Sequence, residues 1–402
     1  MTINVSEGTT AGPDAIAVQR ILAVDPVLHR VERASEALGL RRNELLHAGP
    51  PMTDPGTVCR PILHSAITAI LFEGWADSLE EAERLLHSGM VRLRPAQDVN
   101  CVVPLADVVS PSMWLQGVDD VRFSEVSWSP LNGGSERVLR VGVLGSDVLE
   151  HLRWINGSFA TVLARALRKP VSLLEIADRG LAGGDDCHGR TSVATAALVE
   201  ILEQRLSGSE AGSCRAFLRQ APSFFLNIWM ASSKLMLDAA RGVNGSSIIT
   251  AAGGNGFEFG IQVASNPATW FTARATPPVL AGDQVTAGAE SLGAIGDSAV
   301  VDFLGLGAMT TPAQVVKARH VFPESFRVAA EAPRKLLLAL HPSFGRTRPF
   351  MVTSAQRVID VGQAPIVSLG VLDKGGRLGR LGGGYYRPPL EIFAHAIANL
   401  ER

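Results

Sequence analysis

The sequence holds few features that would tie the chain to an oxidising compartment, to nucleic acid or to a membrane. Its four cysteines stand at wide, irregular spacings without a Cys-x-x-Cys pair, so neither a disulfide framework nor a structural zinc site is indicated. The net charge of −2 comes without a dense run of Lys or Arg, which argues against nucleic acid and anionic membranes as partners. No stretch reaches the roughly 20 apolar residues of a membrane span, and the N-terminus lacks a basic segment followed by an apolar one. We therefore expect a cytoplasmic protein with reduced cysteines.

Nucleotide-binding signatures are missing as well. No Gly-x-Gly-x-x-Gly lies between a strand pattern and a helix pattern, and no phosphate loop with Gly-Lys-Ser or Gly-Lys-Thr occurs. The strand and helix patterns do not alternate regularly, which disfavours a doubly wound parallel sheet. What is present is a chain of 402 residues, 46% hydrophobic and 19% charged, a composition typical of a folded protein with more than one core.

The patterns divide the chain into three parts. Residues 1–145 combine helical patterns at 15–24, 61–74 and 78–89 with short strand-like runs at 91–94, 99–103, 121–128 and 138–143. Residues 146–241 read as helices, at 146–167, 171–181, 191–206 and 223–241. Residues 242–402 are glycine-rich, with strands expected at 247–252, 257–264 and 270–273 and helices at 312–320 and 389–400. We predict an α+β fold class: a multidomain mixed α/β protein with a small helical domain in the middle of the chain.

The segment Gly183–Arg190 is the most chemically dense stretch of the chain. It reads Gly-Gly-Asp-Asp-Cys-His-Gly-Arg and directly precedes the helical pattern that begins at Thr191. Unpaired amides and the positive end of the dipole favour an anion at a helix N-terminus, where Thr191 or Ser192 would supply the capping oxygen. Asp186, His188 and Arg190 are therefore candidates for a site that binds a carboxylate or a phosphate.

Other interpretations of this segment stay open. It fits a polar capping loop in which Asp185 and Asp186 are solvated while Cys187 and His188 merely pack. A metal site would use Asp185, Asp186 and His188, but contiguous residues rarely point at one ion, so no metal is expected. Cys187 lies too close to His188 along the chain to form the usual nucleophile and base pair.

Further polar residues follow along the chain. Lys234 and Asp238 share one face of an apolar helical pattern, as an exposed pair or as the lining of a cavity in which Lys234 would bind an anion. Glu258 stands between two phenylalanines; it either faces solvent or, in a pocket, acquires a raised pKa suited to proton transfer. The remaining candidates stand at turns that enter strands or helices, namely Asn244, Ser246, Ser247, Asn255, Asp297 and Ser298.

Several of these motifs occur in one order that resembles a known bacterial family. They are Gly184–Arg190, Phe225-Leu-Asn227, Gly242–Ser247, Asn255–Gly260, Ile295–Ala299, His47–Pro51 and Val109–Met113. On these motifs the chain resembles the YlbE-like (AllG-like) family over about residues 15 to 320. Departures include Asp186 and Gly189 in the first motif, Arg241 where a histidine is usual, and Ala96–Asn100 in place of a histidine-rich run.

The resemblance implies a subunit of oxamate carbamoyltransferase, which converts oxalurate and phosphate to oxamate and carbamoyl phosphate in allantoin breakdown. It also implies a hetero-oligomer with a FdrA-like, acyl-CoA-synthetase-like subunit and a third protein. We expect no cofactor. Arg190, Lys234 and the amides near Ser246 and Ser247 would then bind the anion, while Asp186, His188 or Glu258 moves the proton. The alternatives are another carbamoyl acceptor, a noncatalytic scaffold or regulatory subunit, and a stand-alone amidohydrolase.

Overall fold

The computed structural model describes residues 12–54, 56–120, 122–135, 137–281, 288–318, 326 and 331–400. Small sheets and numerous helices are interspersed along the chain, which confirms the predicted mixed α+β class. The α-helices are α1 (Pro13–Ala23), α2 (Ala34–Ala37), α3 (Arg60–Glu73), α4 (Leu79–His87), α5 (Ser146–Trp154), α6 (Ala160–Ala166), α7 (Leu174–Ala182), α8 (Ser192–Glu203), α9 (Ala211–Arg219), α10 (Phe224–Asp238), α11 (Ala299–Leu304), α12 (Ala313–Ala318), α13 (Ala332–Leu336), α14 (Ala355–Val361) and α15 (Leu390–Ala398). Short 3-10 turns lie at η1 (Ala96–Val99), η2 (Leu139–Val141) and η4 (Gly307–Met309), and a π-helical turn, η3 (Ile155–Phe159), joins α5 to α6.

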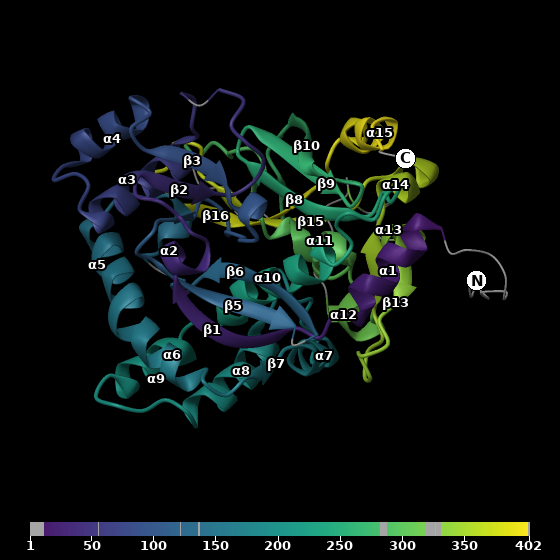
Figure 1. Ribbon diagram of the computed structural model, residues 1–402, viewed down its shortest axis with the longest axis horizontal. Helices are drawn as coiled ribbons and strands as arrows, with labels where there is room; N and C mark the ends of the chain where they lie inside the picture. Colours follow the sequence, from purple (N-terminus) through teal and green to yellow (C-terminus); the bar gives the residue numbers. More distant parts are fainter. Residues whose placement is uncertain are drawn as a thin grey trace.

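The strands form separate sheets rather than one continuous sheet. They are β1 (Val27–Arg33), β2 (Glu44–His47), β3 (Arg92–Pro95), β4 (Val108–Val109), β5 (Trp114–Asp120), β6 (Phe123–Pro130), β7 (Val171–Ser172), β8 (Ile249–Asn255), β9 (Glu258–Val263), β10 (Asn266–Arg274), β11 (Val279–Leu280), β12 (Ile295–Gly296), β13 (Leu337–Leu340), β14 (Phe350–Thr353), β15 (Val367–Leu372) and β16 (Arg380–Tyr386). Their orders are β6-β5-β1-β7, β10-β9-β8-β12, β11-β16-β15, β3-β2-β4 and β13-β14. In Figure 1 the sheet of β8, β9 and β10 lies in the upper half beside α15, and the sheet of β1, β5 and β6 lies below it.

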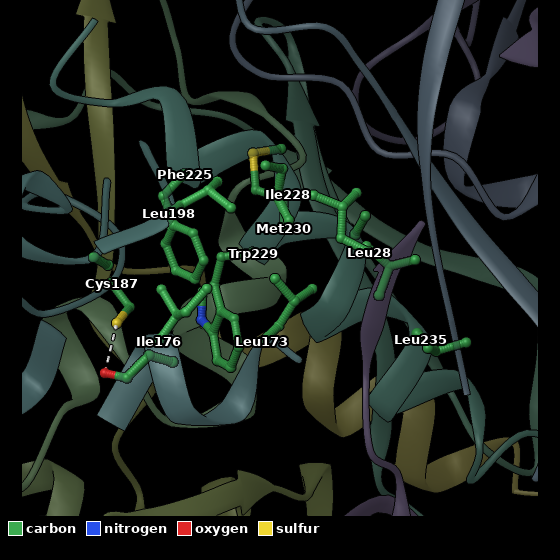
Figure 2. Packing of buried hydrophobic residues seen from close by; sticks show 14 of the residues in the cluster. Leu28, Leu173, Ile176, Cys187, Leu198, Phe225, Ile228, Trp229, Met230 and Leu235 are labelled. Carbon is green, nitrogen blue, oxygen red and sulfur yellow. Dashed lines mark hydrogen bonds between the residues drawn. The ribbon is translucent and has the colours of Figure 1, made fainter. Parts of the chain in front are cut away.

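Helix α10 runs through the interior and joins these layers. It packs against β5 and β6 on one side, β8 and α11 on another, and α8 on a third. Its sequence, FFLNIWMASSKLMLD, is apolar nearly all the way round, the pattern of a helix that is buried on every face. Figure 2 shows Phe225 and Trp229 of this helix packed among Leu198, Ile176 and Cys187. The first turn of α10 is therefore fixed by packing, and residues of this turn line the candidate site.

Most of the expected elements are confirmed with shifted ends. The strands predicted at 247–252, 257–264 and 270–273 are β8, β9 and β10, and the helix predicted at 389–400 is α15. The segment 171–181 begins as β7 before α7 starts at Leu174. The helix predicted at 312–320 is α12 as far as Ala318, and its last two positions lie outside the described residues.

Two predicted strands are wrong. Residues 99–103 begin at the last residue of the 3-10 turn η1 and contribute only an isolated bridge between Cys101 and Trp128. Residues 138–143 contain the 3-10 turn η2. Both are short apolar runs, which periodicity alone cannot assign. Their amides are paired without a strand: that of Gly142 donates to the carbonyl of Leu139 within the turn, and that of Val103 donates to Asp297 at 3.0 Å.

Strand β1 was not predicted, although it is an inner strand of its sheet. Its sequence, VLHRVER, carries charges that obscure the alternation of a strand. Arg30 from this strand donates from Nε to Asp119 of β5 at 2.9 Å, and this pairing lets a charged residue lie in the middle of a sheet.

The division into three domains stays a prediction. The largest buried apolar cluster draws on residues from Ala17 to Val352. Within the described ranges, no helix has the length and apolar character needed to cross a bilayer.

Candidate functional site

A pocket of about 310 Å³ opens where the loop before α8 meets the first turn of α10 and the β15–β16 hairpin. We call it the arginine pocket, because three arginines line it. The wall residues come from segments far apart in the sequence: Pro104, Leu105, Arg140, Asp186, His188, Gly189, Arg190, Ser223, Leu226, Asn227, Ala281, Ser298, Ser368, Leu369, Gly370, Arg380, Gly383, Gly384 and Tyr385. Its size suits a small ligand rather than a large cofactor.

His188 contributes an imidazole to the arginine pocket, and this ring is paired with a buried carboxylate. Its Nδ1 lies 2.7 Å from Oδ2 of Asp302 in α11, and the two side chains are 6% and 0% exposed. Burial by itself lowers the pKa of His188, but the charge and the hydrogen bond of Asp302 outweigh burial and raise it overall. Asp302 is fixed in turn, since its Oδ1 accepts from the amides of Ala308 at 2.8 Å and Ser368 at 3.2 Å. This leaves Nε2 as the ring nitrogen that is not bound to Asp302.

Asp186 shapes the loop that carries His188. Its Oδ1 accepts from the backbone amides of His188 at 2.8 Å and Arg190 at 2.9 Å, which closes the loop into a tight turn. The carbonyl of Asp186 accepts from the amide of Gly307 at 2.7 Å. Gly307 has a φ of +57°, and a Cβ atom there would collide with Asp302, so only glycine fits against the histidine and aspartate pair.

The loop does not present a free helix N-terminus. Asp185 accepts from the amide of Ala194 at 2.9 Å and from the hydroxyl of Ser192 at 3.3 Å, so this carboxylate occupies the positive end of α8. The expectation that Thr191 or Ser192 caps the helix is wrong, because the Thr191 hydroxyl donates to the carbonyl of Pro222 instead. Cys187 is buried, and burial raises the pKa of its thiol well above the usual value, which makes it a packing residue.

Two of the three arginines form no ion pair with a carboxylate among the described residues. In the part of the chain that the structure describes, Arg140 donates to Asn132 and Arg380 donates to the carbonyl of Gly382, and neither forms an ion pair with a carboxylate. Burial, together with the positive charge of Arg380, lowers the pKa of Arg140 to about 10, although the Asp107 carboxylate opposes this shift. The pocket is thus strongly positive, because guanidinium groups from different segments share it.

The structure brings four of the predicted site residues together and places the others elsewhere. Asp186, His188, Arg190 and Ser298 line the arginine pocket. Asp297, the neighbour of Ser298, points away and accepts from the amides of Gly49 at 2.8 Å and Val103 at 3.0 Å. Burial raises the pKa of Asp297 to about 7 in spite of these donors.

Ser246 and Ser247 lie outside this pocket and anchor the N-terminal helix. Both hydroxyls donate to the carboxylate of Asp14 in α1 at 2.8 Å, and the amide of Ser247 donates to it at 2.7 Å. Asn244 precedes them in the same turn, at Gly242–Ser247, and is not part of the pocket wall. The anion that these hydroxyls and amides bind is therefore a side chain of the protein itself.

Lys234 is buried in the middle of α10 as half of an internal ion pair. Its Nζ lies 2.5 Å from Oδ1 of Asp238 and donates to the carbonyl of Thr250 at 3.2 Å. Burial lowers the pKa of Lys234, which the charge of Asp238 opposes. The Lys234 side chain is 0% exposed and does not line the arginine pocket. Lys234 and Asp238 are therefore neither an exposed ion pair nor part of the lining of this pocket.

Asn255 and Glu258 belong to the hairpin between β8 and β9. The Asn255 amide donates to the carbonyl of Pro50 at 3.1 Å, and its oxygen accepts from the amides of Phe257 and Glu258. Glu258 accepts from the hydroxyls of Thr53 and Thr272 and is half-buried. Neither residue lines the arginine pocket. The convergence expected for Asn244, Ser246 and Glu258 with His188 and Arg190 is thus not found.

Sequence reasoning missed Arg140, Arg380, Asp302 and Asn132. Arg140 and Arg380 stand alone between apolar and glycine residues, and Asp302 lies inside an apolar helix, so none of them carries a local signal. Asn227, in contrast, belongs to the Phe225-Leu-Asn227 motif and lines the pocket. Across the described ranges, no group of three or more His, Cys, Asp or Glu side chains is placed to hold a metal ion.

Comparison with known proteins points to one family. The profile of the oxamate carbamoyltransferase subunit AllG family matches residues 91–298. The oxamate carbamoyltransferase subunit AllG of Escherichia coli K12 is 29% identical over 98% of this chain and 98% of that protein. The uncharacterized protein YahG of the same strain is 28% identical over 95% of this chain and 84% of that protein. The crystal structure of a conserved protein of unknown function from Enterococcus faecalis V583 shares the fold, with a TM-score of 0.87, 24% identity and 96% of each chain covered.

Proposed function

We propose that this chain, which belongs to the AllG family of oxamate carbamoyltransferase subunits, binds the anionic substrate of a carbamoyltransferase complex in its arginine pocket. The observation that supports this most directly is the convergence of Arg140, Arg190, Arg380 and the His188–Asp302 pair on one small pocket. Family membership suggests transferase activity within a multi-subunit assembly. We extend this to the reaction of oxalurate with phosphate, in the cytoplasm.

The proposed step is carbamoyl transfer between nitrogen and phosphate oxygen. A phosphate oxygen attacks the carbamoyl carbon of oxalurate, and a tetrahedral oxyanion forms. The bond between carbon and nitrogen then breaks, which releases carbamoyl phosphate and oxamate once the nitrogen has taken up a proton. Preorganised cationic donors stabilise such an oxyanion, and Arg190 stands beside His188 in the pocket wall for this purpose.

His188 is the proposed proton donor to the leaving nitrogen. Asp302 holds Nδ1 and raises the pKa of the ring, so the protonated form persists closer to neutral pH and Nε2 can deliver the proton. Asp186 has a structural part in this proposal, because it fixes the amides of both His188 and Arg190. The proposed partners are a FdrA-like, acyl-CoA-synthetase-like subunit and a third protein.

The test replaces Arg190 with lysine in the assembled complex. Lysine keeps the charge but loses the planar fork that binds a carboxylate or a phosphate by two hydrogen bonds. We expect Arg190→Lys to raise the substrate KM or lower the rate by roughly ten- to hundredfold, the equivalent of about 1.5–3 kcal/mol. Folding and subunit association should stay intact. The matched control is Arg179→Lys, an exposed arginine of α7 that pairs with Glu200.

Unchanged kinetics in Arg190→Lys would contradict this assignment. So would a variant whose only defect is weaker complex formation, since that result would identify the chain as a noncatalytic scaffold for its partners.

A further inference from the structure

Arg140 is held in one orientation by two buried asparagines. Its Nη1 donates to Oδ1 of Asn132 at 3.1 Å, and Nδ2 of Asn132 donates to the carbonyl of Ser223 at 2.8 Å and to Oδ1 of Asn227 at 3.2 Å. Nδ2 of Asn227 donates to the carbonyl of Pro130 at 3.0 Å. Because a backbone carbonyl only accepts, these two carbonyls fix the Asn132 amide with its oxygen toward the guanidinium and the Asn227 amide with its oxygen toward Asn132. Arg140 is thus preorganised before any ligand arrives.

Arg380 lines the same pocket from the C-terminal part of the chain. It begins strand β16, where a bulge interrupts the pairing between Leu372–Arg380 and Val371–Gly382. Bulges of this kind redirect a side chain next to a site. Arg380 turns back to donate Nε to the carbonyl of Gly382 at 3.2 Å. Gly383 lies close to this guanidinium in the pocket wall, since a Cβ atom there would be 3.7 Å from Nη2 of Arg380.

The charge around these two arginines is not balanced within the pocket wall. They are close enough that the charge of Arg380 lowers the pKa of Arg140. Among the described residues neither forms an ion pair, and the carboxylate that acts on Arg140 is Asp107, which lies outside this pocket wall. Ser223, Leu226 and Asn227 place the first turn of α10 in the same wall, which adds the positive end of a helix dipole. An anion between the two guanidinium groups would offset their mutual repulsion.

We propose that Arg140 and Arg380 form a clamp for the carboxylate of the substrate, and that Asn132, supported by Asn227, positions Arg140 in this clamp. The proposal rests on the proposed function in placing the substrate in the arginine pocket, and it adds a specificity subsite to the site of His188 and Arg190. A planar carboxylate matches the fork of a guanidinium, and one carboxylate can accept from both arginines. The substrate is accordingly a small carboxylic acid. Its carboxylate binds to Arg140 and Arg380, and its transferable group faces His188.

The test measures binding by isothermal titration calorimetry on the full purified chain, with oxamate and inorganic phosphate as separate probes. We expect Arg140→Gln to weaken oxamate binding by roughly ten- to hundredfold, the size of a lost charge-assisted contact. Arg380→Gln should act in the same direction. Arg137→Gln is the matched control, because Arg137 lies three residues away on the same segment with its side chain 68% exposed. Its oxamate binding should equal that of the unaltered chain.

Arg140→Lys guards against a folding defect, since it keeps the charge and should retain part of the affinity. In the assembled complex, Arg140→Gln should raise KM for oxamate more than it lowers kcat.

Oxamate binding that is unchanged in both glutamine variants would overturn the proposal. Loss of phosphate binding alone would overturn the carboxylate assignment, and absence of oxamate binding by the unaltered chain would do the same. A chain that binds oxamate through Arg140 while the complex transfers no carbamoyl group would instead refute the proposed function and leave the clamp in place.

Discussion

At the scale of the residue, the chemistry of this protein depends on which side chains are left without an internal partner. Lys234, Ser246 and Ser247 are reactive types, yet each is bound to a carboxylate of the chain itself, Asp238 or Asp14. Arg140 and Arg380, among the described residues, have no such carboxylate. Arg140 is half-buried and Arg380 is exposed where they line the pocket, so an incoming anion can interact with both guanidinium groups.

The pairing of His188 with Asp302 gives a prediction about pH. Asp302→Asn removes the charge that raises the pKa of His188 while burial continues to lower it, so we expect this pKa to fall. An amide also forces Nδ1 to accept, which leaves the proton on Nε2 in the neutral ring. The limb of the kcat/KM profile that reports His188 should move to lower pH, and the rate should drop by about 10²–10⁴-fold.

The pKa shift can be followed without any activity. Proton NMR titration of the purified chain, with the His188 resonance identified by its loss in His188→Gln, reports the pKa directly. Oδ1 of an asparagine can still accept from Ala308 and Ser368, so the fold should survive. A His188 resonance that titrates at the same pH in Asp302→Asn would show that Asp302 does not control the ring.

At the scale of the element, the helix ends decide where a ligand can bind. The N-terminus of α8 has the features of an anion site, but Asp185 fills it. The first turn of α10 instead contributes Ser223 and Asn227 to the pocket wall, and the all-round burial of α10 keeps this turn rigid. One helix end therefore stabilises the fold and the other helps to form the site.

The cap of α8 gives a prediction about stability. Asp185→Ala removes the carboxylate that accepts from the amide of Ala194, and such losses cost about 0.5–2 kcal/mol. We expect the free energy of unfolding, measured by urea denaturation, to fall by this amount with an unchanged slope. Asp185→Asn keeps an acceptor and should cost less.

Ser192→Ala is the control for this helix end. Ser192 is exposed and contributes one hydrogen bond of 3.3 Å to Asp185, so its replacement should stay within about 0.5 kcal/mol of the unaltered chain. If Ser192→Ala cost more than Asp185→Ala, the residue within the helix would be the cap and the interpretation given above would be wrong.

At the scale of the whole molecule, the arginine pocket exists because distant parts of the chain pack together. Arg140, the loop around His188, the first turn of α10 and the β15–β16 hairpin all contribute to it. The family profile matches residues 91–298, so Arg380 and Ser368 come from outside the matched region. The chain is similarly identical to AllG and to YahG, at 29% and 28%, which does not distinguish one substrate from another.

The subunit character of the family gives a prediction about the isolated chain. We expect the purified protein alone to show little carbamoyltransferase activity, because the proposed chemistry needs a complete complex. Carbamoyl phosphate consumption in the presence of oxamate should be measured with and without the partner subunits. The Arg190→Lys variant, for which we expect reduced activity, is measured in parallel in the reconstituted sample. Robust turnover by the single chain would show that it is a complete enzyme.

The sequence by itself determined the local features of this protein. The spacing of apolar residues predicted α10, α15 and the strands β8 to β10, because helix and strand periods are local properties. The composition of Gly183–Arg190 identified the loop that carries His188 and Arg190. The sequence could not show which polar motifs belong to the site, as at Ser246 and Glu258. Their hydrogen-bond partners, Asp14 and Thr272, come from other segments of the chain.

Only the tertiary structure decided which of these residues share a site. Asp302 lies 114 residues from His188 along the chain, and their contact at 2.7 Å needs α11 and the loop before α8 to pack together. Arg140 and Arg380 carry no local pattern, and they gain their importance from meeting in one pocket without a carboxylate partner among the described residues. Periodicity records which face of an element is buried, whereas a pocket is made by the packing of elements on one another, and that packing depends on contacts between residues far apart in sequence.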